Sequence, residues 1–312
     1  MNNRPSRSSL PAWGAGDGSL ALIRAMPAVF VLIWSTGFIV ARYGMPHAPP
    51  MTFLAIRYTL SVVCLMAWVW IAGATWPSSP RQWLHLSMTG ILMHGIYLGG
   101  VWTAVKLGMG AGLTSLLTSL QPVLTAIWLS SRGHRVTVAQ WLGLSLGLSG
   151  LLLVVWAKLG VGEAHLVNLA CATAALLGIT VGTLYQKRYV APCDVRTANL
   201  IQLAAAFIVT LPVSYFEAEP VRWLMQDGRA NLQLLGAMAW SVLGLTLGGS
   251  SLLYLLIQRG AATSVASLFY LVPPTTALIA WALFGEPITA LTITGTALAA
   301  IGVSIVVRQR TA

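Results

Sequence analysis

The chain has 312 residues, of which 57% are hydrophobic and only 8% are charged, and its formal net charge is +11. A soluble domain carries charge on about a quarter of its residues, so this composition excludes a soluble fold and requires lipid to cover the apolar surface. The basic residues are spread between apolar runs rather than gathered in a patch, which argues against nucleic acid as a partner.

Residues 1–26 are mostly polar and include Pro5 and Pro11, so we expect a tail outside the membrane. The apolar run that follows has no small-residue cleavage site, and further apolar runs come after it. This run is therefore interpreted as a membrane helix and not as a signal peptide.

Ten apolar runs follow one another, each near the length of about 20 residues that crosses a hydrocarbon core as a helix. The predicted spans are 27–44, 51–72, 84–105, 111–131, 138–157, 166–186, 197–214, 233–257, 262–283 and 289–307. The sequence therefore predicts an all-α membrane protein with ten transmembrane helices.

The basic residues between the spans predict the orientation of the chain. If the N-terminus is cytoplasmic, the inner side holds Arg4, Arg7, Arg24, Arg81, Arg132, Arg135, Lys187, Arg188, Arg196, Arg259, Arg308 and Arg310. The outer side then holds only Lys106, Lys158, Arg222 and Arg229. The excess of inner cations predicts that both termini are cytoplasmic and that the protein lies in a cell inner membrane.

An internal repeat links the two halves of the chain. Residues 107–155 align without a gap to 259–307, which pairs Pro122 with Pro274, Gly143 with Gly295 and Gly150 with Gly302. We therefore expect a first five-helix repeat at 27–157, a second at 158–307 and a short tail at 308–312. Because five is odd, the second repeat enters from the opposite side of the membrane. Inverted repeats of this kind place one substrate site between the halves of many secondary transporters.

Several motifs resemble those of one known family. They are Trp34-Ser35-Thr36-Gly37-Phe38, Phe53 with Arg57-Tyr58, Leu120-Gln121-Pro122-Val123, Leu271-Val272-Pro273-Pro274 and Phe284-Gly285-Glu286-Pro287-Ile288-Thr289. Nearly all of the chain after residue 27 resembles an EamA-type member of the drug/metabolite transporter superfamily. The resemblance implies ten helices in two EamA repeats and export of amino acids or related metabolites. The first-half counterpart of Glu286 is His134, so that copy of the turn lacks the carboxylate.

Arg57 and Arg42 lie near the outer ends of the second and first predicted spans. A charge buried in the membrane is costly, so such a residue normally faces a cavity or an interface. We predict that Arg57 meets the carboxylate of a small-molecule substrate. Snorkelling to the headgroups, or pairing with a loop acid such as Glu286, is the alternative.

The predicted spans hold no carboxylate in their interior, which argues against a carboxylate proton relay. His94, near the middle of the third span, is the remaining candidate for a proton site. A neutral imidazole that hydrogen-bonds between helices explains the same position.

The other candidates for the substrate pathway are polar or aromatic residues inside apolar spans, where facing lipid is unfavourable. They are Trp34, Ser35, Thr36, Tyr97, Trp102, Ser115, Gln121, Thr183, Tyr185, Gln202, Tyr254 and Tyr270. Packing between helices explains inward-facing side chains equally well. Pro122, Pro273 and Pro274 lie within spans and free backbone carbonyls there, so we predict hinges, with fixed kinks as the alternative.

Other functional classes find less support. An intramembrane enzyme needs a paired set of catalytic or metal-binding groups, but the histidines are scattered and the spans hold no Asp. No Gly-x-x-x-x-Gly-Lys loop occurs, and the three cysteines lack metal or redox spacing. We therefore predict no catalytic residue, no metal and no cofactor. A channel-like facilitator without ion coupling stays open, as do the substrate, the direction of transport and the oligomeric state.

Overall fold

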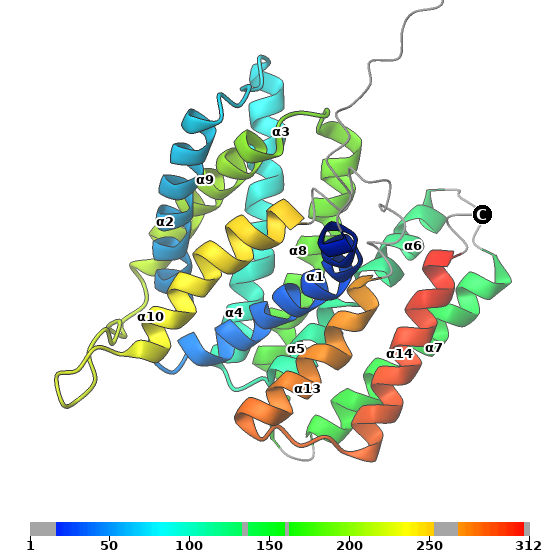
Figure 1. The fold of residues 1–312 in the computed structure, drawn as a ribbon. Helices are drawn as coiled ribbons and strands as arrows, with labels where there is room; N and C mark the ends of the chain where they lie inside the picture. The colour runs from blue at the N-terminus through cyan, green and yellow to red at the C-terminus, as the bar shows by residue number, and fades with distance from the viewer. Residues whose placement is uncertain (1–16, 133–136, 160–161, 253–267, 309–312) are drawn as a thin grey trace, which may run out of the picture.

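The structure is a computed structural model that describes residues 17–132, 137–159, 162–252 and 268–308, and these residues form helices (Figure 1). The first half contains α1 (Asp17–Gly44), α2 (Pro50–Ile71), α3 (Pro80–Gly90), η1 (Ile91–Ile96), α4 (Tyr97–Lys106), α5 (Ala111–Thr118), α6 (Gln121–Ser131) and α7 (Val138–Leu159). The second half contains α8 (Leu166–Tyr189), α9 (Val195–Ser214), α10 (Leu232–Ala239), η2 (Trp240–Gly249), η4 (Phe269–Leu271), α13 (Val272–Phe284) and α14 (Ala290–Arg308). No strand occurs within these ranges.

Seven helical runs in the described residues are long and apolar enough to cross a membrane. They are Ala25–Gly44, Pro50–Ile71, Pro80–Lys106, Trp141–Leu159, Leu166–Tyr189, Val195–Ser214 and Leu232–Leu252, and two shorter apolar helices follow at Val272–Phe284 and Ala290–Gly302. The predicted class, an all-α membrane protein, is confirmed. The count of ten crossings stays a prediction.

The fourth predicted span, 111–131, is wrong as a single continuous helix. It is divided into α5 and α6, and the break falls just before Pro122. Proline has no N–H to donate to the carbonyl four residues earlier, so the bond to Thr118 is lost where α5 ends. Pro273 and Pro274 likewise lie in the first turn of α13, directly after the short turn η4. The three prolines thus begin helical segments and do not lie in helix interiors.

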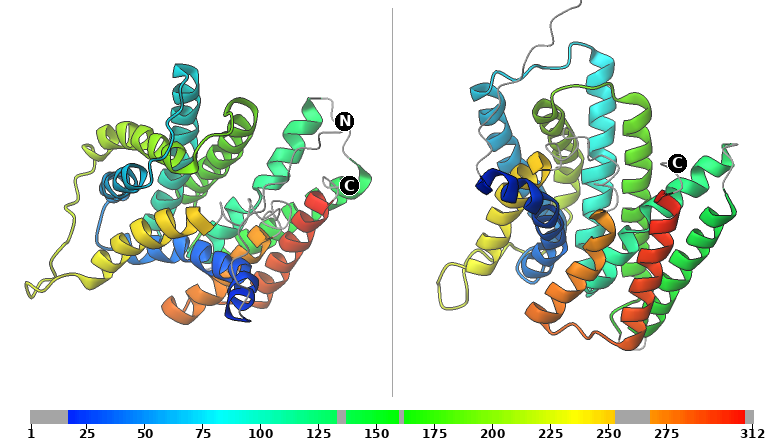
Figure 2. Two further views of the ribbon diagram at one scale, coloured as in Figure 1. Left: turned by 45° about the horizontal axis from the view of Figure 1, so that its top comes forward. Right: turned by 45° about the vertical axis from the view of Figure 1, so that its right-hand side comes forward.

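The contacts between the two halves are symmetric, because equivalent helices of each half have equivalent partners in the other. Helices α7 and α14, the last of each half, lie side by side (Figures 1 and 2). A side chain at Gly150 would overlap the backbone of Gly295, and one at Gly302 would overlap the backbone of Gly143 and Gly147. The glycines that match in the sequence repeat therefore meet in space, as expected for small residues that let membrane helices approach closely.

The first helix of each half also packs on the third helix of the other half. The third helix of the first half packs on α8, while α10 and η2 of the second half pack on α1. Helices α2 and α9, the second of each half, contact each other. Both third helices contain a π-helical segment, η1 in the first half and η2 in the second. Segment η2 packs on α1 and α2, whereas η1 packs on α8 and α9.

Candidate functional site

Arg57 lies two turns inside α2, and its guanidinium is buried among helices from both halves. The residue is 7% exposed. One terminal nitrogen, Nη2, lies 3.4 Å from the hydroxyl of Thr246 in η2, and Nε has no hydrogen-bond partner among the described residues. Ser61, one turn further along α2, donates to the same Thr246 hydroxyl, which donates in turn to the carbonyl of Ser241. The hydroxyl of Thr246 is thus the side-chain partner of Arg57 among the described residues.

The neighbouring residue Tyr58 connects α2 to the first π segment. The Tyr58 hydroxyl donates to the His94 carbonyl over 2.7 Å, and the His94 side chain is hydrogen-bonded to Gln202 of α9. Arg57 interacts electrostatically with His94, Tyr58 and Tyr97. The Arg57 cluster is defined by the residues that share these contacts: Arg57, Tyr58, Ser61, His94, Tyr97, Gln202 and Thr246. Since π segments often mark functional positions in helices, their meeting at a buried cation makes this cluster the candidate site.

The Arg57 cluster contains no carboxylate. Among the described side chains, the acids lie at connections: Glu163, Asp194, Glu217, Glu219, Asp227 and Glu286. None of their ion pairs includes Arg57. The alternative pairing with Glu286 is wrong, because that carboxylate accepts from the backbone N–H groups of Ala111 and Gly112. A buried cation in this membrane protein therefore lacks an anionic partner within the described residues.

A second group of candidates lies where α1 meets α13. Ser35 is fully buried and donates to the carbonyl of Val272 over 3.4 Å, directly before Pro273. Thr36 accepts from the Trp240 indole at 2.8 Å. Trp34 packs edge-on against Phe269, with ring centroids 5.2 Å apart. The motif at 34–36 therefore joins α1 to the proline-bearing segment of the other half.

Two further candidate pairs bridge the halves. The Gln121 side-chain amide donates to the Thr183 hydroxyl over 2.8 Å, which joins the start of α6 to α8. The Tyr185 hydroxyl lies 2.8 Å from Nδ1 of His85 in α3. These residues are half-buried and lie in contacts separate from the Arg57 cluster.

The remaining candidates are not part of these polar groups. Trp102 is 1% exposed and stacks on Phe53 with ring centroids 4.5 Å apart, which is a core contact. The Ser115 hydroxyl donates to the Gly112 carbonyl of its own helix. Tyr254 lies outside the described residues, as do His134 and the side chain of Tyr270. No three His, Cys, Asp or Glu side chains in the described ranges are close enough together to hold a metal ion.

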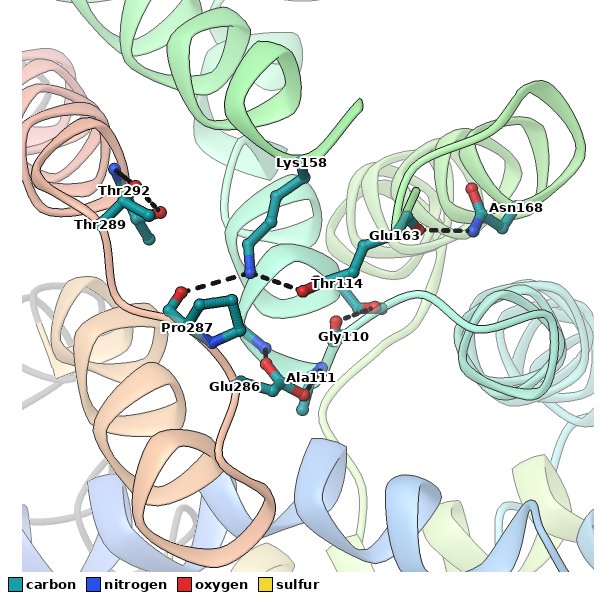
Figure 3. Close-up of polar contacts among 11 residues, drawn as sticks. Gly110, Ala111, Thr114, Lys158, Glu163, Asn168, Glu286, Pro287, Thr289 and Thr292 are labelled. Carbon is teal, nitrogen blue, oxygen red and sulfur yellow. Dashed lines mark hydrogen bonds and ion pairs between the residues drawn. The ribbon is translucent and has the colours of Figure 1, made fainter. Parts of the chain in front are cut away.

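A separate polar network lies at one end of the bundle, where the connections hold Glu163, Glu217, Glu219, Asp227 and Glu286; we call it the acidic end. Figure 3 shows Glu286 reaching the start of α5, and Lys158 beside Glu163 and Pro287. Glu217 accepts from the backbone N–H groups of Met51 and Thr52 at the start of α2, both at 2.8 Å. Carboxylates are favourable at helix N-termini, where backbone N–H groups are unpaired. Two acids of the second half thus cap helices of the first.

A small cavity beside Glu286 completes the acidic end. It has a volume of about 20 Å³ and is lined by Lys158, Glu286, Thr292 and apolar neighbours. That volume suits a single water molecule, so it is too small for a metabolite. The contacts at the acidic end thus join connections of the second half to the helix starts of the first.

The sequence interpretation missed Tyr58, Ser61 and Thr246 as members of the site. Tyr58 stands in the Arg57-Tyr58 motif, and Thr246 is a hydroxyl residue in a long apolar run. Both features were visible, but nothing local connects Thr246 to an arginine 189 residues earlier. The π segments η1 and η2 were also missed, since their apolar composition does not differ from that of an α-helix.

The long apolar helices place the chain among polytopic membrane proteins. Residues 24–156 and 167–308 each match the model of the EamA-like transporter family. The chain belongs to this family, with two EamA repeats, and the family assignment made from the sequence motifs is confirmed.

Known relatives are similar over most of their length. The uncharacterized inner membrane transporter YedA of Escherichia coli strain K12 is 24% identical over 86% of this chain and 85% of the relative. A probable amino-acid metabolite efflux pump of Salmonella typhimurium strain LT2 is 26% identical over 93% of this chain and 94% of the relative. A solved crystal structure has the same fold, with a TM-score of 0.60 and 18% identity over 92% of this chain and 98% of that one.

Proposed function

We propose that this protein is an inner-membrane secondary transporter that exports amino acids or related small amphipathic metabolites. The proposal depends mainly on one observation, the buried Arg57 with an unpartnered Nε and no carboxylate in its surroundings. A substrate carboxylate would supply the missing anion, and charge-assisted pairs of this kind are the stronger hydrogen bonds of proteins. The relatives named as inner membrane transporter and amino-acid metabolite efflux pump support this class.

The topology belongs to the same proposal. Residues 27–157 and 158–307 form two inverted five-helix repeats, with cytoplasmic tails at 1–26 and 308–312. In this arrangement the acidic end faces the periplasm. The positive-inside distribution of basic residues supports the orientation.

Alternating access between the halves is the proposed mechanism. Two of the hydrogen bonds that join the halves at candidate residues are Gln121 to Thr183 and Trp240 to Thr36. Pro122 and Pro273 each lack the one backbone bond that their nitrogen would donate to the preceding turn, which lowers the cost of bending there. Substrate binding at Arg57 and rearrangement at these prolines would expose the site to each side in turn.

The first test is efflux from proteoliposomes loaded with a panel of radiolabelled amino acids and small carboxylates, with and without an imposed pH gradient. Saturable efflux of at least one compound is expected. A response to the gradient identifies a proton-coupled carrier, with His94 as the proposed proton site, whereas indifference identifies a facilitator. Efflux of no compound in either condition would overturn the proposal.

The second test locates the pathway. Arg57→Ala and Gln121→Ala are expected to lower transport without lowering membrane insertion. Arg229→Ala and Gln233→Ala are matched controls, because both residues are exposed at the acidic end. Normal transport by both Arg57→Ala and Gln121→Ala would show that the pathway lies elsewhere.

A further inference from the structure

The Arg57 cluster offers a substrate one positive charge and no negative charge. Its members are one arginine, two tyrosines, a serine, a threonine, a glutamine and a histidine. Each of these groups except the arginine is neutral at pH 7 when the imidazole is unprotonated. A carboxylate that enters the cluster therefore finds a cation, but an ammonium group finds no anion.

Each carboxylate whose side chain the structure describes has at least one partner, although the buried Oε2 of Glu163 has none among the described residues. Glu217 and Glu286 each accept from two backbone N–H groups at a helix start. The ion pairs are Lys106–Glu219, Lys158–Glu163, Arg196–Asp194 and Arg229–Asp227. The seventh acid, Asp17, is the first residue of α1, and the sequence has no other Asp or Glu. No acid whose side chain is described thus has a hydrogen bond or ion pair with Arg57 or with another member of the Arg57 cluster.

We infer that the Arg57 cluster selects carboxylates with a net negative charge over zwitterions of the same shape. This inference rests on the proposed transport function and narrows its substrate class to 2-oxo, 2-hydroxy or N-acyl acids. An ammonium taken from water into this buried place loses its hydration without gaining an ionic partner. An oxo or hydroxy group at the same carbon instead finds hydroxyl and amide groups suited to neutral hydrogen bonds.

The placement of the polar groups supports this preference, since they come from several helices around Arg57. Thr246 approaches Arg57 from η2, and Tyr58 connects α2 to the His94 carbonyl of η1. Gln202 of α9 lies against His94. A small acid with its carboxylate on Nε of Arg57 is then surrounded by neutral donors and acceptors from α2, η1, η2 and α9.

The test compares compounds that differ only at the α carbon. Phenylpyruvate, phenyllactate, N-acetylphenylalanine and phenylalanine, with a parallel set on the leucine side chain, are assayed for saturable efflux from proteoliposomes at pH 7. The anions are expected to have KM values lower by about tenfold or more than the matching zwitterions, the factor for one unsatisfied charged group.

A variant supplies the missing charge. Gln202→Glu places a carboxylate beside His94 within the Arg57 cluster and is expected to reduce the preference for anions at least tenfold, since the ammonium gains a partner. Gln233→Glu makes the same change at an exposed residue of the acidic end and serves as the control, with an unchanged preference.

The outcomes separate the two proposals. Zwitterions that move as well as, or better than, the anions in the wild-type protein would overturn the anion preference and leave the transport function standing. Efflux of neither kind of compound would overturn both. Because the wild-type comparison needs no substitution, a misfolded Gln202→Glu protein would not remove the test.

Discussion

Lys106 and Lys158 at the acidic end have carboxylate oxygens at 2.5 Å and 2.9 Å, whereas the buried Arg57 has only a hydroxyl at 3.4 Å. The acidic end also uses Glu217 and Glu286 to satisfy backbone N–H groups of α2 and α5. The charged groups named at that end have partners within the chain, although the buried Oε2 of Glu163 at the same end has none among the described residues. An intramembrane cation without an anionic partner is costly, and this uncompensated charge is the reason we propose that Arg57 binds a ligand.

The largest expected effect comes from Arg57→Met, which removes the charge and keeps a side chain of similar length. Transport kcat/KM should fall by about tenfold to a hundredfold, the loss of one charge-assisted hydrogen bond. Thermal stability in detergent should stay equal or rise, because an apolar side chain replaces a buried unpaired charge. If the variant unfolds at a lower temperature and transports normally, Arg57 is a structural residue. The contrast between Arg57 and the acidic end would then be wrong.

Glu286→Ala should have the opposite effect, a loss of stability with transport unchanged. Removing the carboxylate leaves the N–H groups of Ala111 and Gly112 without their acceptor and should lower stability by about 1–2 kcal/mol, as for other helix caps. Thermal unfolding measures this loss, and substrate KM should be unchanged. Glu217→Ala at the start of α2 is the matched variant from the same end. A raised KM in either variant would place the acidic end in the substrate pathway.

Thr183→Val removes one hydroxyl between the halves and tests whether that contact changes during transport. The variant loses the bond to Gln121 and should be destabilised by about 1 kcal/mol. A stopped-flow or counterflow assay should show a several-fold change in turnover with little change in KM if the contact is exchanged during transport. Unchanged turnover would limit the Gln121–Thr183 pair to static packing.

The smallest effect is expected from Glu219→Gln, because the Glu219 side chain is 61% exposed and exposed ion pairs contribute little. The Lys106 ammonium lowers the pKa of Glu219 below its ordinary value. The pair therefore stabilises the protein above the ordinary carboxyl pKa, and this contribution is lost as pH falls through the lowered pKa. Melting temperatures of both proteins should differ slightly at neutral pH and converge in acid. A large difference in melting temperature would show that the Lys106–Glu219 pair contributes more to stability than expected.

Local signals in the sequence predicted much of the fold. The predicted spans 51–72 and 197–214 lie within two residues of α2 and α9, because apolar length and flanking polar residues determine such helices. The fourth span was predicted as one helix but is divided near Pro122. A proline within an apolar run does not show from sequence whether the helix bends or ends there. Arg57 was identified because a cation in an apolar run is visible without structure. Its hydroxyl partner was not, because only folding brings η2 against α2.

The glycine contact between α7 and α14 has a consequence for the origin of the chain. Gly150 meets Gly295 and Gly302 meets Gly143, so the same two repeat positions face each other in both directions. Such an interface is isologous, as in a symmetric dimer. A single five-helix unit with these glycines would present a surface complementary to itself, and its pairing would depend on concentration. Joining two units in one chain makes that pairing independent of expression level and lets each half acquire its own side chains around Arg57.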